Sequence, residues 1–178
     1  MTDVSAAADR DERTYSGLFG AFPYAFRRSD SRLFRSFVVV GGLAALAVAS
    51  LFGLALILLV GGSASAQAGV FTFSRSFYVV VALFVTAPLL APVLLVARHH
   101  RRSEADLGYD RALAATGYTY LFSLYLMLVI SAPPARRDPA EGVLAPAIEF
   151  LYGLDPLYGL VPPILAAAVI YLVHRWRR

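Results

Sequence analysis

Four long blocks of apolar residues, almost free of charge, constrain this chain more than any other feature of its sequence. A block of about 20 such residues is long enough to cross the hydrocarbon core of a bilayer as a helix. Periodic burial in a soluble core does not require charge to be absent from such long stretches. We therefore expect an all-α polytopic membrane protein whose four transmembrane helices form an up-down bundle, over residues 36–60, 77–97, 112–130 and 157–173.

Composition separates this chain from soluble proteins in the same way. Hydrophobic residues make up 58% of the 178 positions and charged residues 16%, whereas about a quarter of the residues in a soluble domain are charged. Cysteine is absent, which excludes a disulfide framework, an iron–sulfur cluster and a thiolate zinc site. The partner that this composition indicates is the lipid bilayer.

The basic residues predict how the chain is oriented. All 16 are arginine, and they cluster beside the apolar blocks rather than on a basic face with stacking aromatic residues, so we expect no nucleic acid as a partner. All except Arg75, Arg136 and Arg137 lie before the first block, between the second and third, or after the fourth. The excess of arginine on cytoplasmic loops places these three segments inside the cell. The sequence thus predicts a multi-pass protein of the cell membrane with both termini cytoplasmic.

The segments between the spans have distinct compositions. We expect a disordered cytoplasmic tail, an aromatic and arginine-rich juxtamembrane segment that anchors at the membrane surface, two outer loops, a cytoplasmic loop and a cytoplasmic C-terminus. The tail is residues 1–14 and the juxtamembrane segment is 15–35. The outer loops are 61–76 and 131–156, the cytoplasmic loop is 98–111 and the C-terminal segment is 174–178.

Several residues predict where helices begin and end. Gly61 and Gly62 end the first span, and Asp110 is expected as the N-cap of the third. In the second outer loop, Pro146 opens a short helix that is interfacial or re-entrant, within residues 143–153. Asp155 and Pro156 supply the N-cap and the first helical position before the fourth span.

The first span carries small residues at every fourth position, namely Gly41, Ala45, Ala49 and Gly53. Small side chains on one stripe let another helix approach closely, which favours packing by dispersion where the hydrophobic effect is absent. We expect a helix–helix contact along this stripe, with a helix of the same chain or of a second copy.

Two other spans carry patterns that fit packing or transport. Pro88 and Pro92 lie one turn apart in the second span and predict a kink, because each removes a backbone donor. Hydroxyl groups gather on one face of the third span, at Thr116, Thr119, Tyr120 and Ser123. Both patterns suit packing inside the bundle, and both also suit a path for a small polar solute.

Chemistry that requires ionisable groups has little support in the sequence. No acidic or basic residue lies in the middle of a span, where such residues usually mark ion paths or catalysis. His99, His100 and His174 stand among arginines at the ends of spans, and the carboxylates Glu104, Asp106 and Asp110 match no metal-ligand spacing. Helix capping and surface charge account for Asp110 and its neighbours. We expect no catalytic residues, no metal and no cofactor, and a protein that is not an enzyme.

Three runs of sequence are distinctive. They are Tyr-Ser-Gly-Leu-Phe-Gly-Ala-Phe-Pro-Tyr-Ala-Phe-Arg-Arg-Ser at 15–29, Ala-Pro-Val-Leu-Leu-Val-Ala-Arg-His-His at 91–100 and Leu-Val-Pro-Pro at 160–163. With the arginine-only, cysteine-free composition they resemble a family of uncharacterised small four-span membrane proteins of halophilic archaea, over most of the chain. The net charge of +4 departs from the acidic character of soluble halophile proteins. The resemblance implies no activity, ligand or functional residue.

Two functions remain in competition at this point. The small-residue stripe, the hydroxyl face and the uncharged spans favour a non-enzymatic accessory or scaffold subunit that packs against other membrane helices. The alternative is a small-solute channel or transporter component, which rests on the two prolines and the hydroxyl groups of the third span.

Overall fold

The computed structural model describes residues 17–62, 69–103, 106–137, 139 and 141–177, and the regular elements in this part of the chain are helices. The tail predicted over residues 1–14 lies outside it. The elements are α2 (Gly17–Arg28), α3 (Arg32–Gly62), α4 (Gly69–His100), α5 (Leu107–Ile130), the 3-10 helix η1 (Pro134–Arg136), α6 (Ala145–Tyr152), the 3-10 helix η2 (Pro156–Leu160) and α7 (Val161–Trp176).

Four of the helical segments are long and apolar enough to cross a membrane, and they match the four predicted blocks. They cover Arg32–Gly62, Phe73–His100, Leu107–Ile130 and Pro156–Trp176. Each of these segments is longer than its predicted apolar block. Ser31, for example, accepts a hydrogen bond from the backbone N–H of Phe34 through its Oγ (3.2 Å), so α3 begins before the charge-free block does.

Several helix ends agree with the sequence analysis. α6 occupies Ala145–Tyr152 with Gly153 as its C-cap, and the side chain of Asp155 accepts from the N–H of Leu157 at the start of η2. α3 is described as far as Gly62, where the described residues stop, so the end predicted at Gly61 and Gly62 stays a prediction. The α6 segment is held by Arg137, whose Nη1 donates to the carbonyl oxygen of Tyr152 (2.7 Å). The short helix predicted in the second outer loop is therefore confirmed as a helix.

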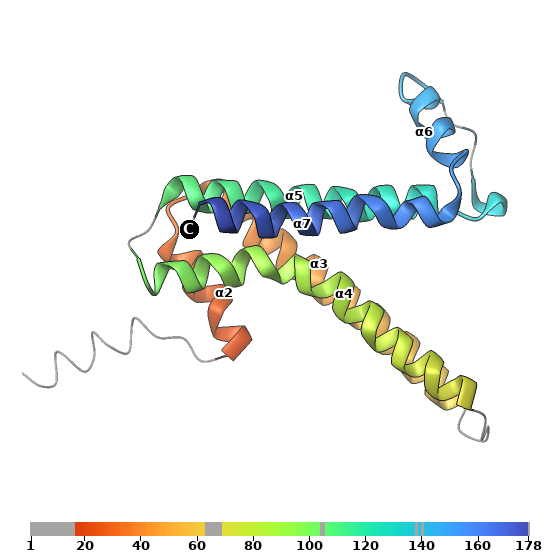
Figure 1. Ribbon diagram of the computed structural model, residues 1–178, viewed down its shortest axis with the longest axis horizontal. Coiled ribbons are helices and arrows are strands. Elements are labelled where there is room, and N and C mark those ends of the chain that lie inside the picture. Colours follow the sequence, from red (N-terminus) through yellow and green to blue (C-terminus); the bar gives the residue numbers. More distant parts are fainter. Residues whose placement is uncertain (1–16, 63–68, 104–105, 138, 140, 178) are drawn as a thin grey trace, which may run out of the picture.

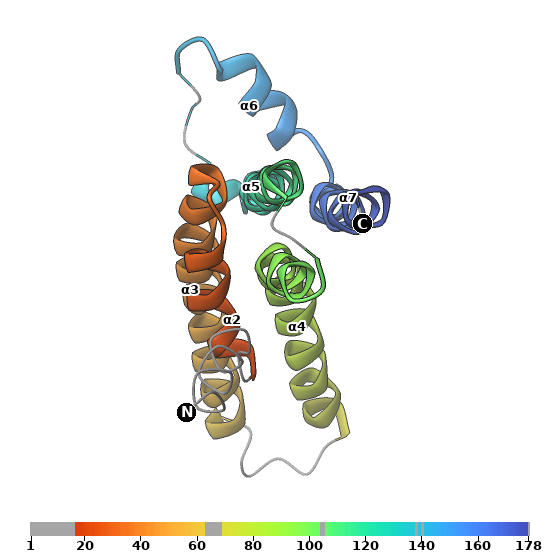
Figure 2. The same ribbon diagram turned by 90° about the vertical axis from the view of Figure 1, so that its left-hand side faces the viewer.

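The long helices form two pairs that diverge from one end of the molecule. Figure 1 shows α5 and α7 side by side, while α3 and α4 run away from them together, and Figure 2 shows the same divergence from the side. α4 contains Pro88 and Pro92 and is visibly bent along its length (Figure 1). The four long helices are thus packed together at one end and diverge toward the other.

Most of the buried core lies toward the end where the pairs meet, which we call the closed end. Many of its large members come from the first half of α3, the second half of α4 and the first half of α5: Phe34, Phe37, Leu89, Val93, Val96, Tyr109 and Leu113. Tyr120, further along α5, is also buried. By contrast, no described side chain in residues 46–62 of α3 or 73–88 of α4 is buried. We call these two stretches the open arm.

Helix α2 packs across the closed end instead of standing apart from the other helices. Ala21 and Ala25 are fully buried and belong to the core, and α2 contacts α4 and α3. Phe26 is partly exposed, and the guanidinium group of Arg35 lies 5.8 Å from the centre of its ring. The aromatic segment predicted as a surface anchor therefore also completes the core of the closed end.

Candidate functional site

A cluster of three buried polar residues, Ser29, His100 and Asp110, joins the helices at the closed end. We call it the polar junction. The Oγ of Ser29 donates a hydrogen bond to Oδ2 of Asp110, and Nε2 of His100 lies 2.9 Å from Oδ1 of the same carboxyl group. The side chains of His100 and Asp110 are 0% and 1% exposed. One carboxyl group therefore links α5 to the end of α4 and to the turn after α2.

The local sequence explains how these three residues meet. α4 ends at His100 and α5 begins at Leu107, so a short connection brings positions 100 and 110 level on two antiparallel helices. Ser29 follows the last residue of α2, and its carbonyl oxygen accepts from Nε of Arg35 (2.7 Å), while its Oγ accepts from the N–H of Ser31 (3.2 Å). The tight turn between α2 and α3 thus aims the hydroxyl group of Ser29 at Asp110.

A second group of rings lies beside the polar junction. The ring of His99 packs on that of Tyr109 with 4.2 Å between centroids, and the Tyr109 hydroxyl group lies 2.6 Å from Nδ1 of His174. Tyr109 is fully buried. This contact ties the last turn of α7 to the hairpin between α4 and α5.

The sequence analysis was wrong about Asp110 and about His100. Asp106 is the N-cap of α5, with its Oδ1 accepting from the N–H of Gly108 (2.7 Å), and Asp110 lies one turn further on in the core. Helix capping and surface charge therefore do not account for Asp110. His100 is buried with Asp110 rather than exposed among arginines, because a buried carboxyl group needs hydrogen-bonding partners. Glu104 lies outside the described residues.

The chemistry of the polar junction is that of a structural link. A serine nucleophile is activated by a base such as an imidazole that accepts its proton. In the polar junction, the hydroxyl group of Ser29 bonds to the carboxyl group of Asp110 instead, and His100 bonds to the other oxygen of that carboxyl group. Nδ1 of His100 is buried and has no hydrogen-bond partner among the described residues. Among those same residues, no group of three or more histidine or acidic side chains is placed to hold a metal ion.

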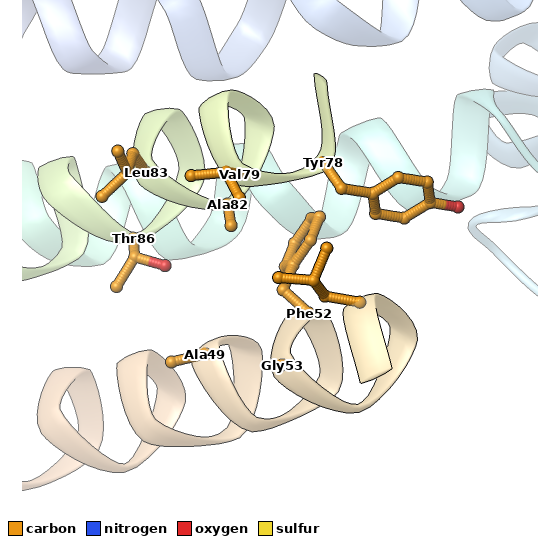
Figure 3. Close-up of a pocket in the computed structure, with 9 residues that line it drawn as sticks. Ala49, Phe52, Gly53, Tyr78, Val79, Ala82, Leu83 and Thr86 are labelled. Carbon is orange, nitrogen blue, oxygen red and sulfur yellow. The ribbon is translucent and has the colours of Figure 1, made fainter. Parts of the chain in front are cut away.

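The small-residue stripe of α3 faces α4 of the same chain over its second half. Gly41 and Ala45 are buried in the core, whereas Ala49 and Gly53 line a cavity of about 290 Å³ between α3 and α4. Figure 3 shows Phe52 pointing from α3 toward the α4 side of this cavity. Its ring meets that of Tyr78 edge-on, with 6.5 Å between centroids. Ala49 and Gly53 thus lie beside a cavity between two helices of one chain, and a Cβ atom at Gly53 would meet nothing within 4 Å.

The hydroxyl groups of α5 are mostly turned back to their own helix. Thr116 Oγ1 donates to the carbonyl oxygen of Leu113 (2.9 Å), Ser123 Oγ to that of Tyr120 (2.6 Å), and Thr119, which is exposed, to that of Ala115 (3.0 Å). Only the Tyr120 hydroxyl group of these four residues reaches another helix, by donating to the carbonyl oxygen of Val85 in α4 (3.1 Å). That bond meets α4 three residues before Pro88.

An apolar groove marks the place where α4 separates from α5 and α7. We call it the open groove. It has a volume of about 280 Å³, and its walls come from all three helices, chiefly Val80 and Phe84 of α4, Leu124 and Met127 of α5, and Ile164 and Ala167 of α7. The sequence analysis did not identify this groove, because the residues that line it are as apolar as those that face lipid.

These features define a class: an all-helical protein with four helices able to span a membrane, two of which, α4 and α5, are linked at one end by a buried pair of polar side chains. At the level of family, the chain matches the model of a domain of unknown function, DUF8056, over residues 1–178, and it belongs to that family. This agrees with the resemblance to an uncharacterised family. Neither the curated proteins nor the solved structures include a match to the chain.

Proposed function

We propose that this protein is a non-enzymatic accessory or scaffold subunit of the cell membrane, which receives a helix of a partner membrane protein in the open groove. The observation that carries the proposal is the groove itself. Val80 and Phe84 on one wall are 56% and 71% exposed, and Ile164 on the other wall is 56% exposed, although all three border the same cavity. α4 diverges from α5 and α7, and the apolar space between them can receive a helix of the partner.

The residues that line the groove support a helix as its occupant. The α7 wall includes Ala167, and a small side chain there allows a neighbouring helix to come close. Tyr120 also lines the groove, and its hydroxyl group is already bonded to the carbonyl oxygen of Val85. A partner helix therefore needs no buried polar groups to fit, and packing by dispersion is sufficient.

We propose the orientation that the arginines indicate, with the closed end and both termini at the cytoplasmic face. Arg98, Arg101 and Arg102 follow the apolar part of α4, and Arg175 and Arg177 follow that of α7, at the same end of the molecule. Their excess supports a cytoplasmic position. We also propose a halophilic archaeal origin, supported by the arginine-only, cysteine-free composition.

A channel or transporter component is the weaker proposal. It requires hydroxyl groups along a path, yet Thr116 and Ser123 bond to carbonyl groups of their own helix. Flux of a small solute through proteoliposomes that disappears in the double variant Thr116→Val, Ser123→Ala would support it over the accessory subunit.

Photocrosslinking in the membranes of the host cell tests the accessory-subunit proposal. A benzophenone amino acid is placed at Phe84, which lines the groove, or at Phe122, which is 59% exposed on α5 outside it. We expect a protein adduct from position 84 only. Filling the groove with Val80→Trp should lower the yield of the adduct from position 84 about tenfold, which corresponds to about 1.4 kcal/mol of binding free energy. The matched change Val169→Trp, on an exposed part of α7 outside the groove lining, should leave the yield unchanged.

Two results would overturn the proposal. One is an equal pattern of adducts from positions 84 and 122, since that indicates random neighbours in the bilayer. The other is a monomer with lipid adducts only, whose yield does not respond to Val80→Trp.

A further inference from the structure

A second cavity, at the closed end, differs from the open groove in its chemistry. It has a volume of about 180 Å³ and lies between the last turn of α4 and the last turn of α7. Its lining is mostly basic and polar, with one apolar wall: Arg98, His99, Arg102, Ser103, His174 and Leu95. We call it the basic cavity.

Within the described part of the chain, no acidic side chain pairs with the arginines of the basic cavity. Arg98 and Arg102 are exposed, and neither forms an ion pair with a carboxylate of the described residues. The carboxyl group of Asp110 is enclosed in the polar junction with His100, and that of Asp106 caps α5. Two guanidinium groups therefore border one small polar cavity, an arrangement that attracts an anion.

The two imidazole groups of the cavity are held in place before any ligand binds. His99 packs on one side of the Tyr109 ring, and His174 is bonded to the Tyr109 hydroxyl group (2.6 Å). Because Tyr109 is fully buried, it fixes both rings relative to α4 and α7. A cavity whose lining is already ordered loses less side-chain entropy on binding.

The position of the cavity along the helices indicates what kind of anion it meets. The segments able to span a membrane end at His100 and Trp176, so the cavity lies at the level where the hydrocarbon core gives way to headgroups. Trp176 is 79% exposed, and tryptophan is enriched at this level of membrane proteins. Leu95 supplies an apolar wall toward the hydrocarbon side, next to the guanidinium groups that suit phosphate oxygens.

We propose that the basic cavity binds the phosphate group of an anionic lipid headgroup. Arg98 and Arg102 contact the phosphate oxygens, the hydroxyl group of Ser103 donates a hydrogen bond, and Leu95 contacts the apolar part of the lipid. This inference requires only that the helices span a bilayer. It does not depend on a partner helix in the open groove, so either proposal can fail while the other stands.

Lipid titration of the full-length protein in detergent micelles, followed by native mass spectrometry, tests the proposal. We expect one tightly bound molecule of dioctanoyl phosphatidylglycerol and no comparable binding of dioctanoylglycerol, which lacks the phosphate group. Arg98→Gln with Arg102→Gln should weaken binding about tenfold or more, because each basic residue near an anionic lipid contributes to affinity. The control Arg27→Gln with Arg28→Gln removes the same charge from α2, outside the cavity lining, and should change the affinity little.

The outcomes separate a built site from diffuse attraction and from free phosphate. Equal weakening in both double variants would overturn the proposal, because it means that the arginines act only by their total charge. Binding of inorganic phosphate with no binding of the lipid would also overturn it. If the Arg98 and Arg102 variant fails to fold, Ser103→Asp places a negative charge at an exposed position of the lining and should weaken lipid binding; unchanged binding in that variant contradicts the proposal.

Discussion

The closed end and the open arm are built from the same two helices, α3 and α4, but they are held in different ways. At the closed end, Phe34 and Phe37 of α3 and Val93 and Val96 of α4 are fully buried, and the polar junction adds hydrogen bonds among three segments. In the open arm the two helices contact each other around a cavity, and no described side chain is buried.

The difference indicates which part of the molecule holds the helices together and which part leaves helix surfaces free to contact other molecules. In lipid, apolar side chains gain little by leaving the hydrocarbon, so close packing and hydrogen bonds decide which helices stay together. The closed end has both, including a hydrogen-bonded carboxyl group that is costly to bury without its partners. The open arm has few such contacts, which suits a surface that meets other membrane components.

The largest effect should follow from removing the carboxyl group of the polar junction. Asp110→Ala leaves His100 buried without the partner at Nε2, and loss of one member of a buried pair costs about 3–5 kcal/mol. Unfolding in mixed micelles, followed by circular dichroism, measures the free energy. Asp155→Ala, which removes an exposed N-cap at the other end, should cost only about 1 kcal/mol. Equal losses would mean that the closed end is not specially stabilised.

A smaller but clear effect is expected where Gly117 of α5 packs against Phe37 of α3. A Cβ atom at Gly117 would lie 2.3 Å from the ring of Phe37, which is fully buried, whereas a Cβ atom at Gly53 in the open arm meets nothing within 4 Å. Gly117→Ala should therefore destabilise the protein by about 1–3 kcal/mol through overpacking. Gly53→Ala should leave the midpoint of unfolding unchanged or raise it. The reverse order of the two midpoints would contradict the comparison.

The smallest effect should come from the hydrogen bond that ties α5 to the open arm. Tyr120→Phe removes the donor to the carbonyl oxygen of Val85 and should cost about 0.6 kcal/mol, the average for such bonds between membrane helices. Tyr125→Phe, at an exposed position of the same helix, is the matched control and should have no effect. A loss of similar size in both variants would show that the bond contributes nothing.

The sequence predicted the spans well because an uncharged block is a local property. It also predicted the short helix that Pro146 opens and the N-cap at Asp155, where one or two neighbouring residues determine the local structure. These features need no knowledge of what packs against them.

The polar junction was missed because it depends on contacts between distant residues. Starting the third span at residue 112 left Asp110 outside the helix, although Asp106 was available as the cap. The short connection between α4 and α5 was a usable indication, since a hairpin of that length sets positions 100 and 110 side by side. The part played by Ser29 could not be predicted, because it requires α2 to dock on α4. The divergence of the open arm from α5 and α7 also could not be predicted from the sequence. A helix that is apolar on every side does not show which side packs against another helix.

Distances between spin labels in lipid nanodiscs test the central comparison most directly, and the absence of native cysteine makes the labelling simple. The first pair of labels, Phe77→Cys and Leu157→Cys, measures the distance from α4 to η2 at the open end. The second pair, Arg101→Cys and Arg175→Cys, measures the distance between the ends of α4 and α7 at the closed end. All four positions are exposed. We predict a clearly longer distance for the first pair than for the second. Equal distances at the two ends would show helices packed along their whole length and would contradict the account.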